Sequence, residues 1–105
     1  MTSNYLNPGP TREDIDTMKG PLMLEFGVDW CPHCIGAQPL AEKTLAEFPE
    51  IKHIQVEDGK GRRLGRSFSV KLWPTFVFLK DGVEAGRAVR PTSIEELADK
   101  LKAIL

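Results

Sequence analysis

Short apolar runs alternate with polar breaks along this chain and predict four strands. Bulky apolar residues fill 22–28 and 74–79, and apolar positions alternate with polar ones in 51–56 and 83–89. Runs of this length and composition favour buried or half-buried strands. Lys80-Asp81-Gly82 separates the last two runs, and Asp-Gly is a strong hairpin signal. The last two strands should therefore be antiparallel neighbours.

Helical periodicity and capping signals predict the remaining elements. Apolar residues at three- and four-residue intervals predict a helix over 34–48, in which Pro39 should produce a kink. A capping threonine with acidic residues behind it predicts a short helix over 11–18. Residues 59–71 should contain one or two helical turns. Residues 93–96 read as a capping box that opens a C-terminal helix.

The order of these elements predicts one α/β domain over residues 11–105, preceded by an arm over 1–10. The long helix joins the first two strands, so they should be parallel, whereas the last two form a hairpin. Tyr5 and Leu6 of the arm should add a short edge strand. The sheet is therefore expected to be mixed.

Charge and composition limit the classes of partner that the chain can bind. The chain has 105 residues, with 14 basic and 15 acidic side chains and a formal net charge of -1. A net charge this close to zero gives no long-range attraction to nucleic acid or to an anionic membrane. The first twenty residues contain no apolar stretch typical of a signal peptide. We expect a cytoplasmic monomer without nucleic-acid or membrane partners.

Both cysteines of the chain lie in the segment Trp30-Cys31-Pro32-His33-Cys34, between the first strand and the long helix. A disulfide across two residues closes a small loop and stabilises little by chain entropy, so it is better suited to opening and closing. Free amides and the helix dipole at this position stabilise an anion. The pKa of Cys31 should therefore lie below the ordinary value of about 8.5.

These features together resemble the thioredoxin family over roughly residues 20–105. The resemblance rests on Trp30 before the cysteine pair, Pro39 in the helix, Pro74-Thr75 about forty residues after the cysteines, and Asp81-Gly82. It implies a thioredoxin-like three-layer α/β/α fold with a mixed central sheet and a C-terminal β-hairpin plus helix. It also implies that Cys31 is the nucleophile and that Cys34 resolves the mixed disulfide.

The resemblance further implies a substrate-binding surface. The Trp73-Pro74 bond should be cis, with the Trp73 backbone exposed to pair with an extended substrate peptide. Trp30 should cover the cysteines or pack beside them. Arg90 stands where thioredoxins commonly have glycine, and it should narrow or charge this docking surface.

Glu25 occupies the position of the buried acid of thioredoxins, where it could accept the proton of Cys34. A carboxylate in an apolar strand is rarely buried without a purpose, although Glu25 could instead face solvent at the sheet margin. His53 lies in or beside the second strand. A satisfied core or edge histidine is the favoured interpretation for it, with contact to Glu25 as the alternative.

The residues between the cysteines bear on the direction of electron flow. Pro32-His33 resembles oxidising periplasmic proteins, and an imidazole beside Cys31 would favour its thiolate and make the disulfide a stronger oxidant. A reducing cytosol argues the other way. We therefore expect a cytosolic disulfide reductase with a relatively oxidising motif. It should need no cofactor beyond the redox-active Cys31-Cys34 disulfide.

The expected partners are proteins that contain disulfides, and an upstream reductase or thiol pool that recycles the cysteine pair. Two other functions stay open. Cys31 and Cys34 could supply half of a zinc or iron-sulfur site, with further ligands from a histidine or a second chain. Alternatively, a thioredoxin-like domain could serve only for docking, without catalysis.

Overall fold

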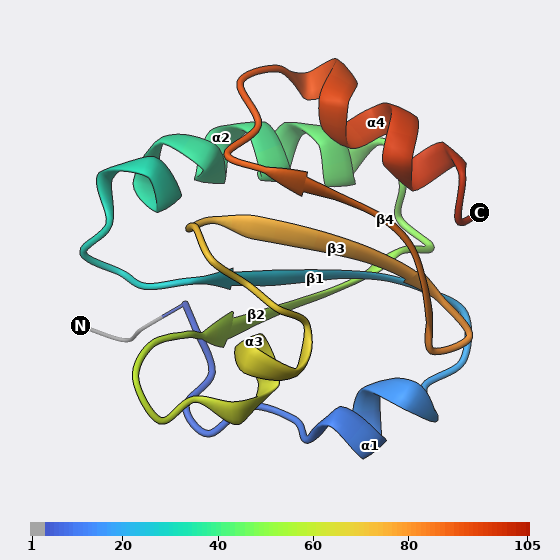
Figure 1. Ribbon diagram of the computed structural model, residues 1–105. Coiled ribbons are helices and arrows are strands. Elements are labelled where there is room, and N and C mark those ends of the chain that lie inside the picture. The colour runs from blue at the N-terminus through green and yellow to red at the C-terminus, as the bar shows by residue number, and fades with distance from the viewer. Residues whose placement is uncertain (1–3) are drawn as a thin grey trace.

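The fold is built around a four-stranded mixed sheet. The computed structural model describes residues 4–105 (Figure 1). Its strands are β1 (Pro21–Gly27), β2 (Lys52–Glu57), β3 (Thr75–Lys80) and β4 (Val83–Val89), in the order β2-β1-β3-β4. β1 pairs with β2 in parallel, and β3 pairs with β1 and β4 in antiparallel fashion. Both predicted pairings are confirmed.

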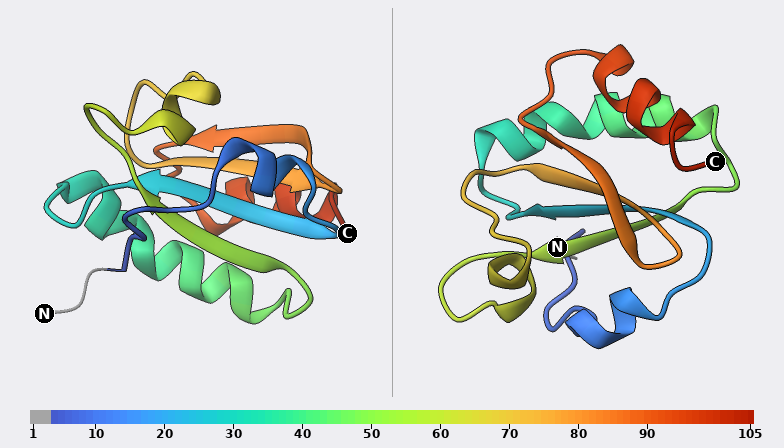
Figure 2. Two further views of the ribbon diagram at one scale, coloured as in Figure 1. Left: turned by 90° about the horizontal axis from the view of Figure 1, so that it is seen from below. Right: turned by 45° about the vertical axis from the view of Figure 1, so that its right-hand side comes forward.

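Helices cover both faces of this sheet. They are α1 (Arg12–Asp16), α2 (Pro32–Ala46), α3 (Arg63–Ser67) and α4 (Ile94–Lys102). α2 and α4 lie on one face, and α1 and α3 lie on the other (Figures 1 and 2). The predicted three-layer arrangement, with a C-terminal hairpin and helix, is confirmed.

Each face of the sheet has its own apolar core because side chains alternate along the strands. Under α2 and α4, the buried side chains include Met23, Phe76 and Phe78. On the opposite face, the cluster includes Leu24 and Phe26. β1 contributes to both cores and is buried from Leu22 to Gly27, so its end, which the cysteines follow, is held in place.

Side-chain caps mark the starts of α1 and α4. Thr11 caps α1, as the sequence indicated, and Asp14 completes a capping box with it. Ser93 caps α4 by accepting from the Glu96 amide, but the Glu96 carboxylate accepts from the amide and hydroxyl of Thr92 rather than from Ser93. The expected box at 93–96 is therefore only half formed, because Thr92 offers two donors to that carboxylate.

The start of the long helix differs from the prediction. α2 begins at Pro32 rather than near Cys34, and Cys31 is its N-cap residue. Proline suits the first helical position because its missing N–H would have no partner there. Pro39 lies inside α2, as expected.

The N-terminal segment packs along β2. The Leu6 amide donates to the Gln55 carbonyl at 2.8 Å, and the Leu6 carbonyl accepts from the Glu57 amide at 3.0 Å. This single parallel bridge is the short edge strand that the sequence predicted. Tyr5 is buried while Leu6 is exposed, so the bridge turns the tyrosine inward, towards the cysteines.

Candidate active site

Cys31 and Cys34 lie at the first turn of α2, directly beyond the carboxyl end of β1. Both are free thiols, with 5% and 1% of their surface exposed. The Cys34 amide donates to the Cys31 sulfur at 3.4 Å. The helix therefore directs a free backbone donor at Cys31, while Cys34 lies one turn deeper.

The pKa values of the two thiols are shifted in opposite directions. The pKa of Cys31 is lowered, although burial alone would raise it. The effects that outweigh burial are hydrogen bonds from the Cys34 amide and thiol, a hydrogen bond from the His33 amide, and the positive charge of Arg90. Burial, together with the neighbouring Cys31 thiolate, raises the pKa of Cys34 to about 11. Cys31 is thus the readily ionised thiol and Cys34 the protonated one, as the sequence predicted for Cys31.

His33 contributes to this arrangement through its backbone. Its side chain is exposed, and the contact that lowers the pKa of Cys31 comes from its amide. An effect of the imidazole on Cys31 stays a prediction.

Two tryptophans lie beside the cysteines. Trp73 packs against the apolar cluster that contains both thiols. The rings of Trp30 and Trp73 meet edge to face, with centroids 5.8 Å apart, and Trp30 is 73% exposed. Trp73 Nε1 donates to Asp58 Oδ2 at 2.8 Å, which fixes its ring. Trp30 thus stands at the surface, and Trp73 lies partly beneath it.

Arg90 occupies the loop beside Trp73. The Trp73-Pro74 bond is cis, as expected. Arg90 Nε donates to the Trp73 carbonyl at 2.8 Å, and the Arg90 amide donates to the Pro74 carbonyl at 3.0 Å. The guanidinium thus occupies one of the two acceptor lone pairs of the Trp73 carbonyl, and pairing of this backbone with an extended peptide stays a prediction.

Glu25 is fully buried, so the alternative that it faces solvent is wrong. Tyr5 Oη donates to its Oε2 at 2.6 Å, and Gln38 Nε2 donates to the same oxygen at 2.9 Å. His53 Nε2 lies 2.9 Å from Oε1, so the contact left open for His53 is present. Gln55 Nε2 reaches Oε2 at 3.4 Å. A dense set of hydrogen bonds thus compensates the burial of this carboxylate.

Tyr5 connects this polar cluster to the thiols. Its hydroxyl interacts with Cys34, which raises the pKa of Tyr5, and the same interaction partly offsets the raised pKa of Cys34. A Cβ atom built on Gly27 would lie 2.7 Å from Cys34 Sγ and 2.9 Å from Tyr5 Oη, so both atoms lie over the same point of β1. Sequence reasoning assigned no site role to Tyr5, Gln38 or Gln55. A tyrosine in a polar arm carries no local signal of such a contact.

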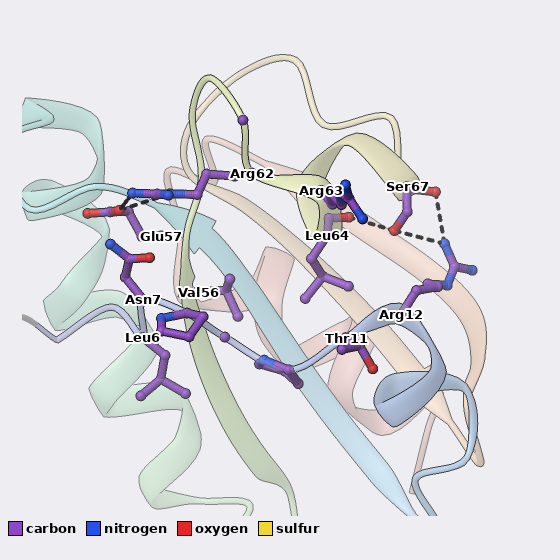
Figure 3. Close-up of a pocket in the computed structure, with 14 residues that line it drawn as sticks. Leu6, Asn7, Thr11, Arg12, Val56, Glu57, Arg62, Arg63, Leu64 and Ser67 are labelled. Carbon is purple, nitrogen blue, oxygen red and sulfur yellow. Dashed lines mark hydrogen bonds and ion pairs between the residues drawn. The ribbon is translucent and has the colours of Figure 1, made fainter.

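Other candidate features lie apart from the thiols. Among residues 4–105, no group of three or more His, Cys, Asp or Glu side chains is arranged to hold a metal ion. A cavity of about 410 Å³ lies between the N-terminal segment and α3, with Leu6, Val56 and Leu64 among its walls. Arg12 and Arg62 at its rim bind Ser67 and Glu57 (Figure 3). Neither cysteine lines this cavity.

The part of the chain that the structure describes contains no helix long and apolar enough to cross a membrane. Its longest helix, α2, has 15 residues.

Comparisons with known proteins agree with this geometry. The family model for thioredoxin matches residues 5–103. Thioredoxin 2 from Pseudomonas aeruginosa, solved in its reduced form, is 51% identical with a TM-score of 0.87, over 99% of this chain and 96% of that one.

Two curated relatives extend the comparison. Thioredoxin Asp f 28 of Aspergillus fumigatus is 28% identical over 84% of this chain and 82% of its own length. Mitochondrial thioredoxin-3 of Saccharomyces cerevisiae is 27% identical over 71% of this chain and 61% of its own length. With a readily ionised thiol at the N-terminus of α2 and a protonated thiol behind it, the chain belongs to the thioredoxin family and is a thiol-disulfide oxidoreductase.

Proposed function

We propose that the protein reduces protein disulfides, with Cys31 as nucleophile and Cys34 as resolving thiol. The difference between the two thiols carries this proposal. A lowered pKa gives Cys31 the larger thiolate fraction, and the thiolate is the attacking species. Cys34 is almost fully buried and protonated, so it reacts only after Cys31 has captured the substrate.

The reaction proceeds in two exchanges. The Cys31 thiolate attacks one sulfur of the substrate disulfide, forms a mixed disulfide and releases the first substrate thiolate. Cys34 then loses its proton and attacks the Cys31 sulfur. The Cys31-Cys34 bond forms while the bond to the substrate breaks, and the second substrate sulfur leaves as a thiolate. The protein is oxidised by two electrons and the substrate disulfide is reduced.

Trp30, Trp73, Pro74 and Arg90 form the proposed docking surface around Cys31. The exposure of Trp30 and the partial exposure of Trp73 supply apolar contact area. An extended peptide that donates to the Trp73 carbonyl meets the Arg90 guanidinium at the same oxygen. Acidic groups of a substrate would bind this guanidinium, which favours acidic residues beside the disulfide.

We assign the protein to the reductive direction, recycled by an upstream reductase or thiol pool, and acting as a cytoplasmic monomer without a bound cofactor. Reducing surroundings keep the pair as thiols, whereas stabilisation of the Cys31 thiolate makes its disulfide a better oxidant. The yeast relative is a mitochondrial protein, so fractionation of the source cells is the direct test of location.

Turnover of an insulin-type disulfide substrate, with dithiothreitol as the electron source, tests the proposal. Cys31→Ser should abolish turnover, and Cys34→Ser should trap the substrate as a mixed disulfide. Intact biological activity in Cys31→Ser would instead indicate a docking role. Stoichiometric zinc or iron in protein purified without chelator, together with no turnover, would indicate a metal-binding role for the cysteine pair.

A further inference from the structure

In the resolving step, Cys34 must lose its thiol proton before it attacks the Cys31 sulfur. In the reduced protein, the thiol of Cys34 donates to the neighbouring Cys31 sulfur and helps to lower its pKa. Once Cys31 is bonded to substrate it is no longer a thiolate, so it is a poor acceptor. Cys34 is 1% exposed, and water therefore has little access to its proton. The proton must pass to a neighbouring group inside the protein.

Tyr5 is the group placed to receive it. Its ring belongs to the same buried cluster as both thiols, and its hydroxyl contacts Cys34. The hydroxyl also donates to Glu25 Oε2 at 2.6 Å, a short charge-assisted bond. A hydroxyl can accept one proton while it donates another. Tyr5 thus has an acceptor lone pair for Cys34 and a donor bond to a carboxylate.

We propose that Tyr5 relays the Cys34 proton to Glu25 during resolution of the mixed disulfide. The S–H proton of Cys34 moves to Tyr5 Oη as the phenolic proton of Tyr5 moves to Glu25 Oε2. Tyr5 stays neutral, Glu25 becomes a carboxylic acid, and the freed electron pair on Cys34 attacks Cys31. This inference rests on the proposed roles of the two cysteines and adds the path of the proton.

The surroundings of Glu25 suit this task. Gln38 donates to Oε2 at 2.9 Å and to Tyr5 Oη at 3.3 Å, so one amide orients both partners of the transfer. His53 Nε2 meets the other carboxylate oxygen at 2.9 Å, and its side chain is 22% exposed. His53 is thus the member of the cluster that connects Glu25 to solvent, where the proton finally goes.

Burial, with the negative charge of Glu25, raises the pKa of Tyr5 above its ordinary value of 10. The phenol therefore does not ionise at neutral pH. Tyr5 therefore passes a proton on only if it accepts one proton and donates another in the same step, as the proposed transfer requires.

Rapid mixing of the reduced protein with a stoichiometric aromatic disulfide, dithiobis-nitrobenzoate, tests the relay. Attack by Cys31 releases one coloured nitrothiobenzoate, and attack by Cys34 on the resulting mixed disulfide releases the second. Tyr5→Phe keeps the ring and removes the hydroxyl. We expect it to slow the second release about tenfold or more at neutral pH while the first keeps its rate, because the loss concerns only a proton transfer.

The pH profile separates a relay from a packing effect. Without the hydroxyl, Cys34 must ionise directly, so the second release in Tyr5→Phe should accelerate steadily as the pH rises, because burial raises the pKa of Cys34. Glu25→Gln should slow the same step, and the double variant should be no slower than the slower single variant, because the two groups act in series. Thr44→Val, which removes a buried hydroxyl that bonds the Leu40 carbonyl, is the matched control and should resolve normally.

Three results would overturn the relay: a wild-type rate of second release in Tyr5→Phe, equal slowing of both releases, or additive losses in the double variant. Failure of the proposed cysteine roles looks different. It would show as two releases in Cys34→Ser, or as a first release that survives Cys31→Ser, whatever happens at Tyr5.

Discussion

At position 90, an arginine adopts a backbone conformation that usually belongs to glycine. Its φ is 49°, in the left-handed region that side chains with a Cβ rarely occupy. This conformation accompanies the hydrogen bond from Arg90 Nε to the Trp73 carbonyl, while the positive charge helps to lower the pKa of Cys31. One residue therefore acts on both the Cys31 thiol and the backbone of Trp73.

Arg90→Gly should raise the pKa of Cys31, because it removes a positive charge that favours the thiolate. Alkylation of Cys31 by iodoacetamide near neutral pH should slow severalfold, and its pH profile should move to higher pH. Arg90→Lys is the control, since it keeps the charge and loses the Nε donor that binds the Trp73 carbonyl. An unchanged alkylation profile in Arg90→Gly would remove Arg90 from the tuning of the thiol.

The effects of the His33 imidazole and of the His33 backbone amide on Cys31 can be separated by mutation. His33→Ala keeps the amide that contacts Cys31 and removes only the imidazole. If the imidazole stabilises the thiolate, this variant should have a more negative reduction potential, measured by equilibration with glutathione. A potential equal to that of the wild type would assign the whole effect of His33 to its backbone.

At the scale of elements, the junction of β1 and α2 determines the positions of the reacting groups. Gly27 ends the strand, and a Cβ there would lie within 3 Å of both Cys34 Sγ and Tyr5 Oη. The strand end thus leaves room for a sulfur and a phenol to meet above its backbone. The sequence indicates a glycine after an apolar run, but not what approaches it from a distant segment.

Gly27→Ala should destabilise the reduced protein by about 1–3 kcal/mol, because the new methyl group overpacks the buried thiol and phenol. Gly36→Ala, in α2 with no atom near its added Cβ, should instead stabilise the protein by about 1 kcal/mol through helix propensity. Urea unfolding in the presence of a reductant measures both. Equal effects of the two substitutions would contradict the crowding at Gly27.

At the scale of the whole molecule, ionisation of the thiols couples redox state to stability. The lowered pKa of Cys31 means that the unfolded chain holds more protons between that pKa and about 9, so stability rises with pH there. The raised pKa of Cys34 has the opposite sign, so stability falls between about 9 and about 11. The reduced protein should therefore be most stable near pH 9 as far as the thiols are concerned.

Subtracting the unfolding free energy of the oxidised protein from that of the reduced one isolates this effect, because the disulfide form has no thiols to titrate. Denaturant unfolding of both forms across this pH range should give a difference that rises and then falls. A difference that declines throughout would show that the pKa of Cys31 is not lowered.

The sequence predicted the strand pairing and the cysteine site, because these depend on local periodicity, a hairpin signal and residues adjacent in the chain. The three layers were implied by the resemblance to thioredoxins. The sequence left the contact of His53 with Glu25 open and did not predict the rest of the cluster, since Tyr5 and Gln38 reach Glu25 from distant segments of the chain. The hydrogen bond from Arg90 to the Trp73 carbonyl was not predicted either, because it joins two segments that are distant in the sequence. Nothing in the composition around an arginine indicates a left-handed backbone.

The chain contains two tryptophans, and both stand beside the cysteine pair. All of its indole fluorescence therefore originates within a few side chains of the reacting sulfurs. A nearby disulfide quenches indole emission, and a docked peptide changes its wavelength. The protein thus carries a built-in optical reporter, through which oxidation and peptide docking can be followed without attaching a dye.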